Sequence, residues 1–238
     1  MGQLSLMLRE GTRQAHTMAE NVGFVKCFLK GTVERTSYRQ LLANFYFIYT
    51  ALERELERHR HHVVLSGLYF PQLYRETSLE RDLHYYYGPT WHEQIQPTVA
   101  ARRYIEQIET VSASEPALLV AHSYTRYLGD LSGGQILKNI AERSMGLTQG
   151  IGTAFYEFEL IPDARAFKHD YRQALDELPV DEQMAARIVT EANDAFKLNM
   201  HLFEELEGSL IKAIGRMVFN SLIRRRNRPE RTVATAAE

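Results

Sequence analysis

The stretch SYRQLLANFYFIYTALERELE, residues 37–57, carries the clearest helical pattern in the chain. Its apolar side chains recur at intervals of three and four residues, which is the spacing of one face of an amphipathic helix. Charged residues such as Arg39, Glu53 and Glu57 fall on the opposite face. The segment therefore predicts a long helix that buries one side. The apolar face consists of Tyr38, Leu41, Leu42, Phe45, Ile48, Tyr49, Leu52 and Leu56.

Further segments of the chain repeat this pattern. A second long stripe of apolar residues runs from Met184 to Met217. Alternation typical of β-strands is nearly absent, and no Pro/Gly/Ser linker divides the chain. We expect one all-α domain over residues 1–226, followed by a flexible polar tail over residues 227–238. Shorter helical patterns cover residues 4–20, 78–87, 99–111, 116–128, 135–144 and 163–178.

The composition excludes several classes of protein. The 238 residues are 45% apolar and 24% charged, and the formal net charge is −2. These values rule out a mainly disordered chain, a collagen-like fibre and a disulfide scaffold, and they predict no general attraction to nucleic acid. No run approaches the roughly 20 apolar residues that span a bilayer, and the first residues lack the apolar run of a signal peptide. We therefore expect a cytoplasmic protein without a membrane anchor.

The glycine-rich motif GDLSGG, residues 129–134, lies between two good helical patterns. Each glycine inside a helix costs about 1 kcal/mol relative to alanine. The simpler interpretation is a break, in which Gly129 ends one helix and Asp130 or Ser132 caps the next. Alternatively the helix continues, and Gly129 and Gly133 lie one turn apart on one face. Two missing side chains would then let a flat molecule press against the backbone, with Asp130 beside it as a polar group.

His16 lies in the first predicted helix, with Glu20 four residues later. A histidine that binds a metal usually donates its other ring N–H to a carboxylate or a carbonyl, and this spacing supplies a carboxylate. Taken alone, an ordinary charged pair on a helix surface is the simpler interpretation.

Two basic residues have the same spacing. Lys168 and Arg172 are four residues apart, so both point the same way and can grip two carboxylates of a ligand. Taken alone, a solvated helix face is the simpler interpretation, and the same two interpretations apply to Arg9. The histidines of ERHRHH, residues 57–62, have no carboxylate cage and are interpreted as a solvated helix end.

Four segments, taken together, resemble haem oxygenase. HSYTRYLGDLSGGQILKNIAE, residues 122–142, resembles the distal helix that is the signature of this family. The resemblance continues in LREGTRQAHTMAENVGFVKCFLKG (8–31), AFKHDYRQAL (166–175) and EANDAFKLNMHLFEELE (191–207). It covers almost the whole chain apart from the tail, and it is closest to the soluble cyanobacterial members. It implies a helical bundle that holds haem between a proximal N-terminal helix and a glycine-kinked distal helix.

The resemblance also implies roles for individual residues. His16 resembles the axial ligand of the haem iron, with Glu20 as its partner. Gly129 and Gly133 resemble the glycines whose backbone lies over the haem face, and Asp130 resembles the acid that holds water near iron-bound oxygen. Residues that match an extension of this polar network are Tyr49, Arg126 and Asn199. Residues that match positions near the haem propionates are Arg9, where animal members often have lysine, Tyr124, Lys168 and Arg172. Phe196 and Phe203 resemble apolar pocket walls.

The activity that follows from this resemblance is oxidative opening of haem at the α-meso carbon. Haem b would be both substrate and cofactor, O2 the oxidant and reduced ferredoxin the electron donor. The products would be biliverdin IXα, carbon monoxide and ferrous iron, and a downstream bilin reductase would use the bilin for phycobilin synthesis.

Two other functions remain open at this point. A haem carrier or sensor would need His16 and the residues that bind the propionates, but it would not need Asp130 in the glycine motif. A thiaminase-like enzyme would use a cysteine nucleophile, whereas Cys27, the single cysteine, lies away from the glycine motif and any acidic cluster. One cysteine also excludes an intramolecular disulfide, and its simplest interpretation is a small buried side chain.

Overall fold

The computed structural model describes residues 3–32, 34–148 and 150–226, with side chains as far as Glu207. These residues form helices and connecting loops and contain no β-strand, so the expectation of an all-α fold is confirmed. The expected tail, residues 227–238, lies outside the described residues. The α-helices are α1 (Leu4–Gly11), α2 (Arg13–Glu20), α3 (Gly23–Leu29), α4 (Arg35–Arg58), α5 (Glu76–Tyr87), α6 (Trp91–Gln94), α7 (Val99–Ser114), α8 (Leu119–Ser123), α9 (Gly129–Met145), α10 (Ala164–Asp176) and α11 (Glu182–Arg226).

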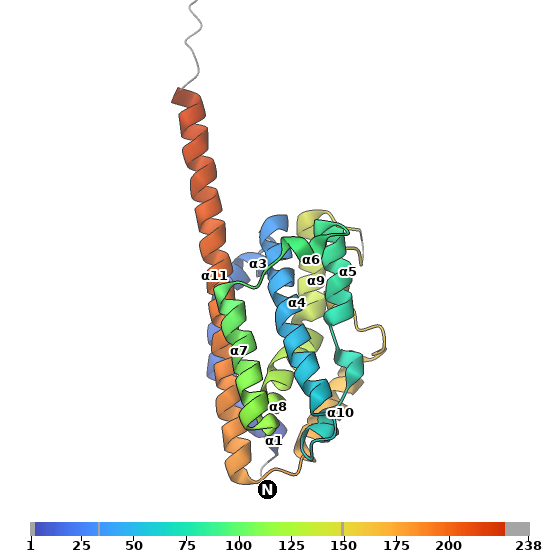
Figure 1. Ribbon diagram of the computed structural model, residues 1–238. Helices are drawn as coiled ribbons and strands as arrows, with labels where there is room; N and C mark the ends of the chain where they lie inside the picture. The colour runs from blue at the N-terminus through green and yellow to red at the C-terminus, as the bar shows by residue number, and fades with distance from the viewer. Residues whose placement is uncertain (1–2, 33, 149, 227–238) are drawn as a thin grey trace, which may run out of the picture.

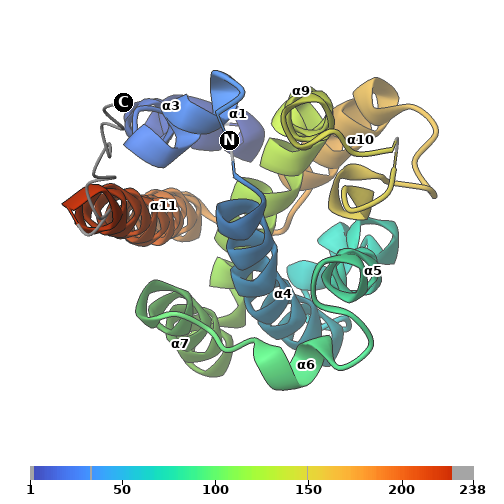
Figure 2. The ribbon, with the colours of Figure 1, turned by 90° about the horizontal axis from the view of Figure 1, so that it is seen from above.

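Short turns connect these helices. They are the 3-10 turns η1 (Leu65–Leu68), η2 (Pro71–Leu73), η3 (Pro116–Leu118) and η5 (Ala154–Tyr156), and the π-helical turn η4 (Tyr124–Leu128). Helix α4 lies in the middle of the bundle and packs against α5 and α7 (Figure 2). Helix α11 runs along one side against α1, α2, α3, α7 and α8, and its C-terminal part extends beyond the other helices (Figure 1).

The two apolar stripes of the sequence contribute to the core, the second as far as Leu206; its last part, residues 208–217, lies outside the residues whose side chains the structure describes. In α4, Leu42, Ile48 and Leu52 are fully buried, as the spacing predicts. In α11, Ile188 and Leu202 are fully buried as well, facing α7, α8 and the N-terminal helices. Complete burial of one such side chain contributes roughly 1.5–3 kcal/mol, so these stripes supply much of the packing energy.

The N-terminal segment, predicted as one helix over residues 4–20, is two helices separated at Thr12. A side chain at Gly11 would place its Cβ 2.5 Å from Val189 Cγ1, so only glycine lets α1 approach α11 this closely. The amide of Asn193 on α11 donates to the carbonyl oxygen of Gly11 at 3.1 Å and satisfies the end of α1. Packing on α11 therefore sets where α1 ends.

The glycine motif does not break the chain into two capped helices. Gly129 has φ −62° and ψ −50°, which are helical values, and α9 continues from there to Met145. The interpretation of Gly129 as a helix end is therefore wrong, and the continuous-helix interpretation is confirmed. What the sequence does not reveal is the π-helical turn Tyr124–Leu128 directly before Gly129. Such turns bend helices and are frequent at functional sites.

Candidate active site

One face of α9 leaves room for a flat molecule. Gly129 and Gly133 lie one helical turn apart, and a Cβ built on either would meet no atom within 4 Å outside its own helix turn. Any larger side chain at these positions would project into that open space. The two glycines therefore form a cradle, and the structure fits the expectation that a planar haem lies against this backbone.

His16 stands on the exposed surface of α2, where 54% of its side chain is accessible to solvent. Its Nδ1 lies 3.7 Å from Glu20 Oε2, a contact that is longer than a hydrogen bond. The ring of Phe196 on α11 meets the imidazole edge to face, with the ring centroids 5.5 Å apart. Because Nδ1 faces Glu20, Nε2 is the nitrogen left for an iron ion.

The four polar residues expected on the distal side form one connected chain. The hydroxyl of Tyr49 donates to Asp130 Oδ2, and Arg126 Nε donates to the Tyr49 hydroxyl oxygen at 3.0 Å. Arg126 Nη1 donates to Asn199 Oδ1 at 2.5 Å, and Asn199 Nδ2 donates to the carbonyl oxygen of Ala195 at 3.1 Å. Helices α4, α9 and α11 and the turn η4 thus meet in a single network that ends at Asp130.

Burial controls the charge state of this network. Loss of solvent raises the pKa of Asp130, although the charges of Arg126 and Arg75 and the Tyr49 hydrogen bond lower it. Burial likewise raises the pKa of Tyr49 far above its ordinary value, so its hydroxyl keeps its proton and remains a donor. The guanidinium of Arg126 lies over the rings of Phe45 and Tyr49, 4.4 and 4.8 Å from their centroids. The half-buried Asp130 carboxyl is therefore held in one orientation, with proton affinity above normal.

A buried carboxylate beneath this network was not predicted. Glu53, placed on the outer face of its helix by the sequence pattern, is only 4% exposed. Its carboxylate accepts the backbone N–H groups of Arg75 and Glu76, and the Tyr127 hydroxyl lies 3.4 Å from it. Burial raises the pKa of Glu53 to about 7 despite these N–H groups. The outward placement of Glu53 is wrong because it neglects α5, whose first N–H groups need an acceptor.

The basic residues expected near the haem edge lie on α1 and α10. Lys168 Nζ is 3.5 Å from the hydroxyl of Ser132, which directly precedes Gly133 on α9. Arg172 donates to the carbonyl oxygen of Lys168 at 3.2 Å. Burial raises the pKa of the Tyr124 hydroxyl, and the charges of Arg172 and Arg9 both lower it. The four residues expected around the propionates, Arg9, Tyr124, Lys168 and Arg172, therefore share one region.

The apolar residues expected to line the site lie on α11. Phe196 contacts His16, as described above. Phe203 stacks nearly parallel on Phe24 of α3, with the centroids 6.0 Å apart. Both phenylalanines are half-buried. Phe203 thus fixes α3 against α11, and Phe196 stands beside the expected iron ligand.

The histidine tract after α4 has local partners. His59 Nε2 lies 3.0 Å from the Ser112 hydroxyl, and His62 Nδ1 accepts the backbone N–H of Val64 at 3.3 Å. Arg60 donates to His61 Nε2 at 3.1 Å. Within the part of the chain that the structure describes, no group of three or more histidine, cysteine or acidic side chains is arranged to hold a metal ion.

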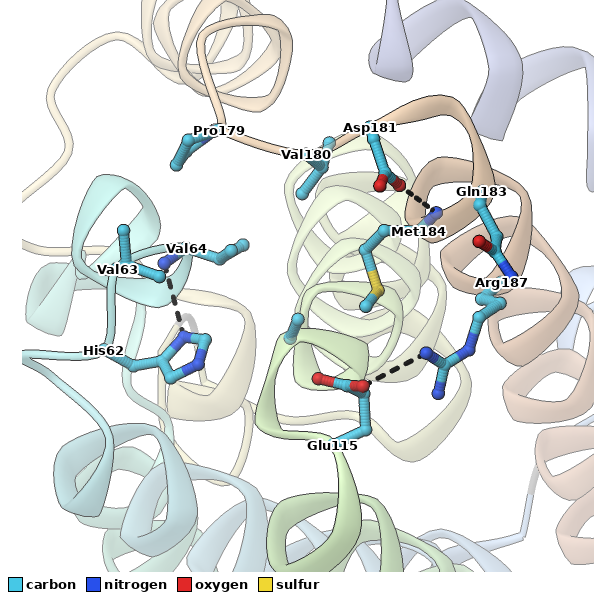
Figure 3. Close-up of a pocket in the computed structure, with 11 residues that line it drawn as sticks. His62, Val63, Val64, Glu115, Pro179, Val180, Asp181, Gln183, Met184 and Arg187 are labelled. Carbon is cyan, nitrogen blue, oxygen red and sulfur yellow. Dashed lines mark hydrogen bonds and ion pairs between the residues drawn. The ribbon is translucent and has the colours of Figure 1, made fainter.

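A pocket of about 430 Å³ lies apart from the cradle, between the histidine tract and the start of α11 (Figure 3). Its charged groups already have structural partners. Arg187 pairs with Glu115 at 3.0 Å, and Asp181 accepts the backbone N–H of Met184 at 2.7 Å. The pocket includes none of the residues that the sequence predicted for the site.

A family model described as Heme oxygenase matches residues 2–205 of this chain. The chain belongs to the haem oxygenase family. Among similar haem oxygenases, haem oxygenase 1 of Nostoc sp. is 61% identical over 233 residues, with 98% of each chain covered. Haem oxygenase 1 of Synechocystis sp. is 58% identical over 233 residues, which cover 98% of this chain and 97% of the relative.

Solved haem oxygenases share the fold. The crystal structure of Synechocystis haem oxygenase-1 in complex with haem has a TM-score of 0.88 and 59% identity, and the match covers 93% of this chain and all of that one. Synechocystis haem oxygenase-2, solved with haem and NO, has a TM-score of 0.88 and 52% identity over 96% of this chain and 94% of that one. The expected haem-oxygenase-like bundle is thus confirmed. Within the described residues, no helix is long and apolar enough to cross a membrane.

Proposed function

We propose that this member of the haem oxygenase family opens the ring of haem b at the α-meso carbon with O2. The products are biliverdin IXα, carbon monoxide and ferrous iron. One observation carries the proposal: the cradle of Gly129 and Gly133 lies directly beside Asp130, whose carboxyl is held by Tyr49. Family membership makes the chain an enzyme of haem degradation and disfavours a carrier or sensor.

In this proposal, haem lies between His16 on α2 and the glycine cradle on α9. His16 provides the axial nitrogen from α2, and its contact with Glu20 favours the imidazole orientation that leaves Nε2 free. The open space beside Gly129 and Gly133 would let their backbone lie over the opposite face of the porphyrin. Phe196 and Phe203 contribute apolar walls, and the propionate carboxylates meet the group formed by Arg9, Tyr124, Lys168 and Arg172.

The bound haem supplies the iron at which O2 is reduced, and the protein supplies orientation and proton control. Asp130 stands beside the open face of α9, where its carboxyl would hold a water molecule next to bound haem and can take up or release a proton. Tyr49 and Arg126 fix that carboxyl, since Arg126 holds the Tyr49 hydroxyl and Asn199 holds Arg126. Preorganised groups of this kind need no rearrangement during the reaction.

Reduced ferredoxin is the electron donor in this proposal, and a bilin reductase is the next enzyme. The resemblance to cyanobacterial members supports both partners, and it supports a cytoplasmic location. The exposed Arg9 and Arg172, with the half-buried Lys168, offer positive charge to an acidic donor near the haem edge.

Turnover is tested by adding hemin, ferredoxin, its reductase and NADPH to the protein. We expect decay of the Soret band together with growth of bilin absorbance. In the same assay, the Asp130→Asn variant is expected to bind hemin but to form little bilin. A stable hemin complex that forms no bilin in the wild-type protein would show that the chain stores or senses haem instead.

A further inference from the structure

A short segment outside the haem cradle packs against a different face of the distal helix. We name this segment, Thr153–Glu157, the strap. The amide of Gln135 on α9 donates to the carbonyl oxygen of Tyr156 at 2.9 Å, and Lys138 donates to the Glu157 carboxylate at 2.6 Å. A Cβ on Gly134 would lie 3.2 Å from the Tyr156 ring. The third glycine of the motif therefore makes room for the strap, whereas the first two face the cradle.

A buried carboxylate from α5 fixes the strap backbone. Asp82 is 1% exposed, and its two oxygens accept the N–H groups of Ala154 and Phe155, each at 2.8 Å. The Arg75 guanidinium donates to the carbonyl oxygens of Phe155 and Glu157 at 3.3 and 2.6 Å. Hydrogen bonds to charged groups are roughly twice as strong as neutral ones. Both backbone polar groups of Phe155 are thus held by charged side chains.

The side chain of Phe155 connects the strap to the distal network. Phe155 is fully buried, and its ring lies 5.5 Å from the ring of Tyr49 and 5.3 Å from that of Phe45. Tyr49 donates to Asp130, and Phe45 lies beneath the Arg126 guanidinium. Phe155 therefore packs directly against Tyr49, which holds the Asp130 carboxyl, and against Phe45, on which Arg126 lies.

We propose that Asp82 is a positioning residue for haem oxygenation: through the strap and Phe155 it fixes Tyr49 and thereby the orientation of Asp130. The proposal rests on the proposed role of Asp130 as the distal acid. Catalytic groups must be held within about 0.5 Å of their productive geometry by neighbours that are themselves fixed. Asp82 does this from α5 without touching the haem site.

Hydrogen–deuterium exchange of the haem-free protein tests the connection. Asp82→Asn replaces one of the two carboxylate oxygens by an NH2 group. This group cannot accept the hydrogen bond that the carboxylate oxygen accepted from a backbone N–H of the strap. We expect exchange of the Ala154 and Phe155 amides to become on the order of tenfold faster, the change produced by about 1.4 kcal/mol of lost stabilisation. Exchange over residues 126–134 is expected to increase as well. Faster exchange in the strap alone would overturn the proposal, because Asp82 would then hold only its own loop.

Glu55→Gln is the matched control. Glu55 is also a buried carboxylate, but it accepts from Ser112 at 2.6 Å on the α7 side of α4. The same chemical change there is expected to leave exchange of the strap and of residues 126–134 unaltered. If Asp82→Asn does not fold, Phe155→Leu removes the ring contact with Tyr49 and keeps the carboxylate, and increased exchange over residues 126–134 is expected from it too.

The haem complex gives a second, spectroscopic readout. The midpoint pH of the alkaline transition of the ferric complex reports how the distal network holds a water ligand. We expect Asp82→Asn and Phe155→Leu to shift this midpoint pH in the same direction. Unchanged midpoints in both variants would overturn the proposal. Failure of the proposed function is distinguishable, since the wild-type hemin complex would then form no bilin, and failure of the role of Asp130 would leave full bilin formation in Asp130→Asn, whatever the exchange measurements show.

Discussion

The hydroxyl of Tyr49 on α4 donates a hydrogen bond to the carboxylate of Asp130 in the first turn of α9. This bond joins the central helix of the bundle to the helix that carries the glycine cradle. Both partners have a pKa raised by burial, so each holds its proton more tightly than in water. The orientation of Asp130 thus depends on a residue from a distant part of the chain.

Tyr49→Phe tests this dependence. The ring and its contact with Phe155 remain, but Asp130 loses its donor and Arg126 loses an acceptor. A hydrogen bond to a charged group contributes about 1.5–3 kcal/mol, so we expect bilin formation to slow by a factor of ten or more while hemin binding stays near the wild-type level. Stopped-flow measurement of single turnovers checks this, and a wild-type rate would mean that Asp130 is positioned without Tyr49.

Gly133→Ala separates haem binding from helix stability. The new methyl group meets no atom within 4 Å outside its own helix turn, and alanine is the better helix former by about 1 kcal/mol. We therefore expect a higher melting temperature in the haem-free protein together with weaker hemin binding. Hemin titration followed by absorbance measures the second effect. Gly129→Ala is the parallel variant, and unchanged hemin affinity in both would place the haem on another face of α9.

The sequence predicted the features that depend on local pattern. The three- and four-residue spacing in residues 37–57 and in the segment after Met184 places the right side chains in the core, because burial of one helix face is a periodic property. The pattern around GDLSGG did not decide between a break and a continuous helix. Glycine is disfavoured inside helices in general, so the motif alone could not show that α9 continues through Gly129 and Gly133.

Features that depend on distant contacts were not predictable in this way. Glu53 looks like a surface residue of α4 until α5 brings the N–H groups of Arg75 and Glu76 against it. Asp82 carries no motif, because its partners Ala154 and Phe155 lie about seventy residues away in a loop. The residues of the proposed distal network were named from family resemblance, whereas the buried charges that support them required the tertiary structure.

His16→Ala should remove the axial nitrogen while leaving the cradle and the basic residues in place. Hemin is expected to bind, but without the absorption spectrum of a histidine-ligated haem. Added imidazole should restore that spectrum in part, since the space left by the side chain has a suitable shape. Absorption and resonance Raman spectra check this. An unchanged axial spectrum would exclude His16 as the ligand and point to another histidine.

Glu53 should make stability depend on pH. Burial raises its pKa to about 7 from 4.5, so the folded protein binds this proton more tightly than the unfolded chain. Its contribution to stability is complete below about pH 4.5 and is lost as the pH rises through 7. One pKa unit corresponds to about 1.4 kcal/mol, so the loss is on the order of 3 kcal/mol.

Urea unfolding at several pH values measures this effect. Glu53→Gln cannot ionise, so the fall in its free energy of unfolding between pH 5 and pH 8 should be smaller than in the wild-type protein. Glu57→Gln alters an exposed carboxyl on the same helix and should keep the wild-type dependence. Equal slopes for all three proteins would show that Glu53 is ionised throughout this range.

The regiochemistry of ring opening should depend on Lys168 and Arg172. A porphyrin with two propionates can rotate in a mostly apolar slot, and the meso carbon that faces the bound oxygen determines the isomer formed. Charge-assisted bonds to the propionates contribute about 1.5–3 kcal/mol each, so their loss can cost a tenfold preference or more. We expect Lys168→Ala with Arg172→Ala to lower the α share of biliverdin while His16 ligation is kept. Chromatography of the bilin isomers measures the share.

Arg58→Ala with Arg60→Ala removes two exposed positive charges at the end of α4 and should leave the product purely α. A purely α product from the first pair as well would mean that the distal helix alone selects the site of attack.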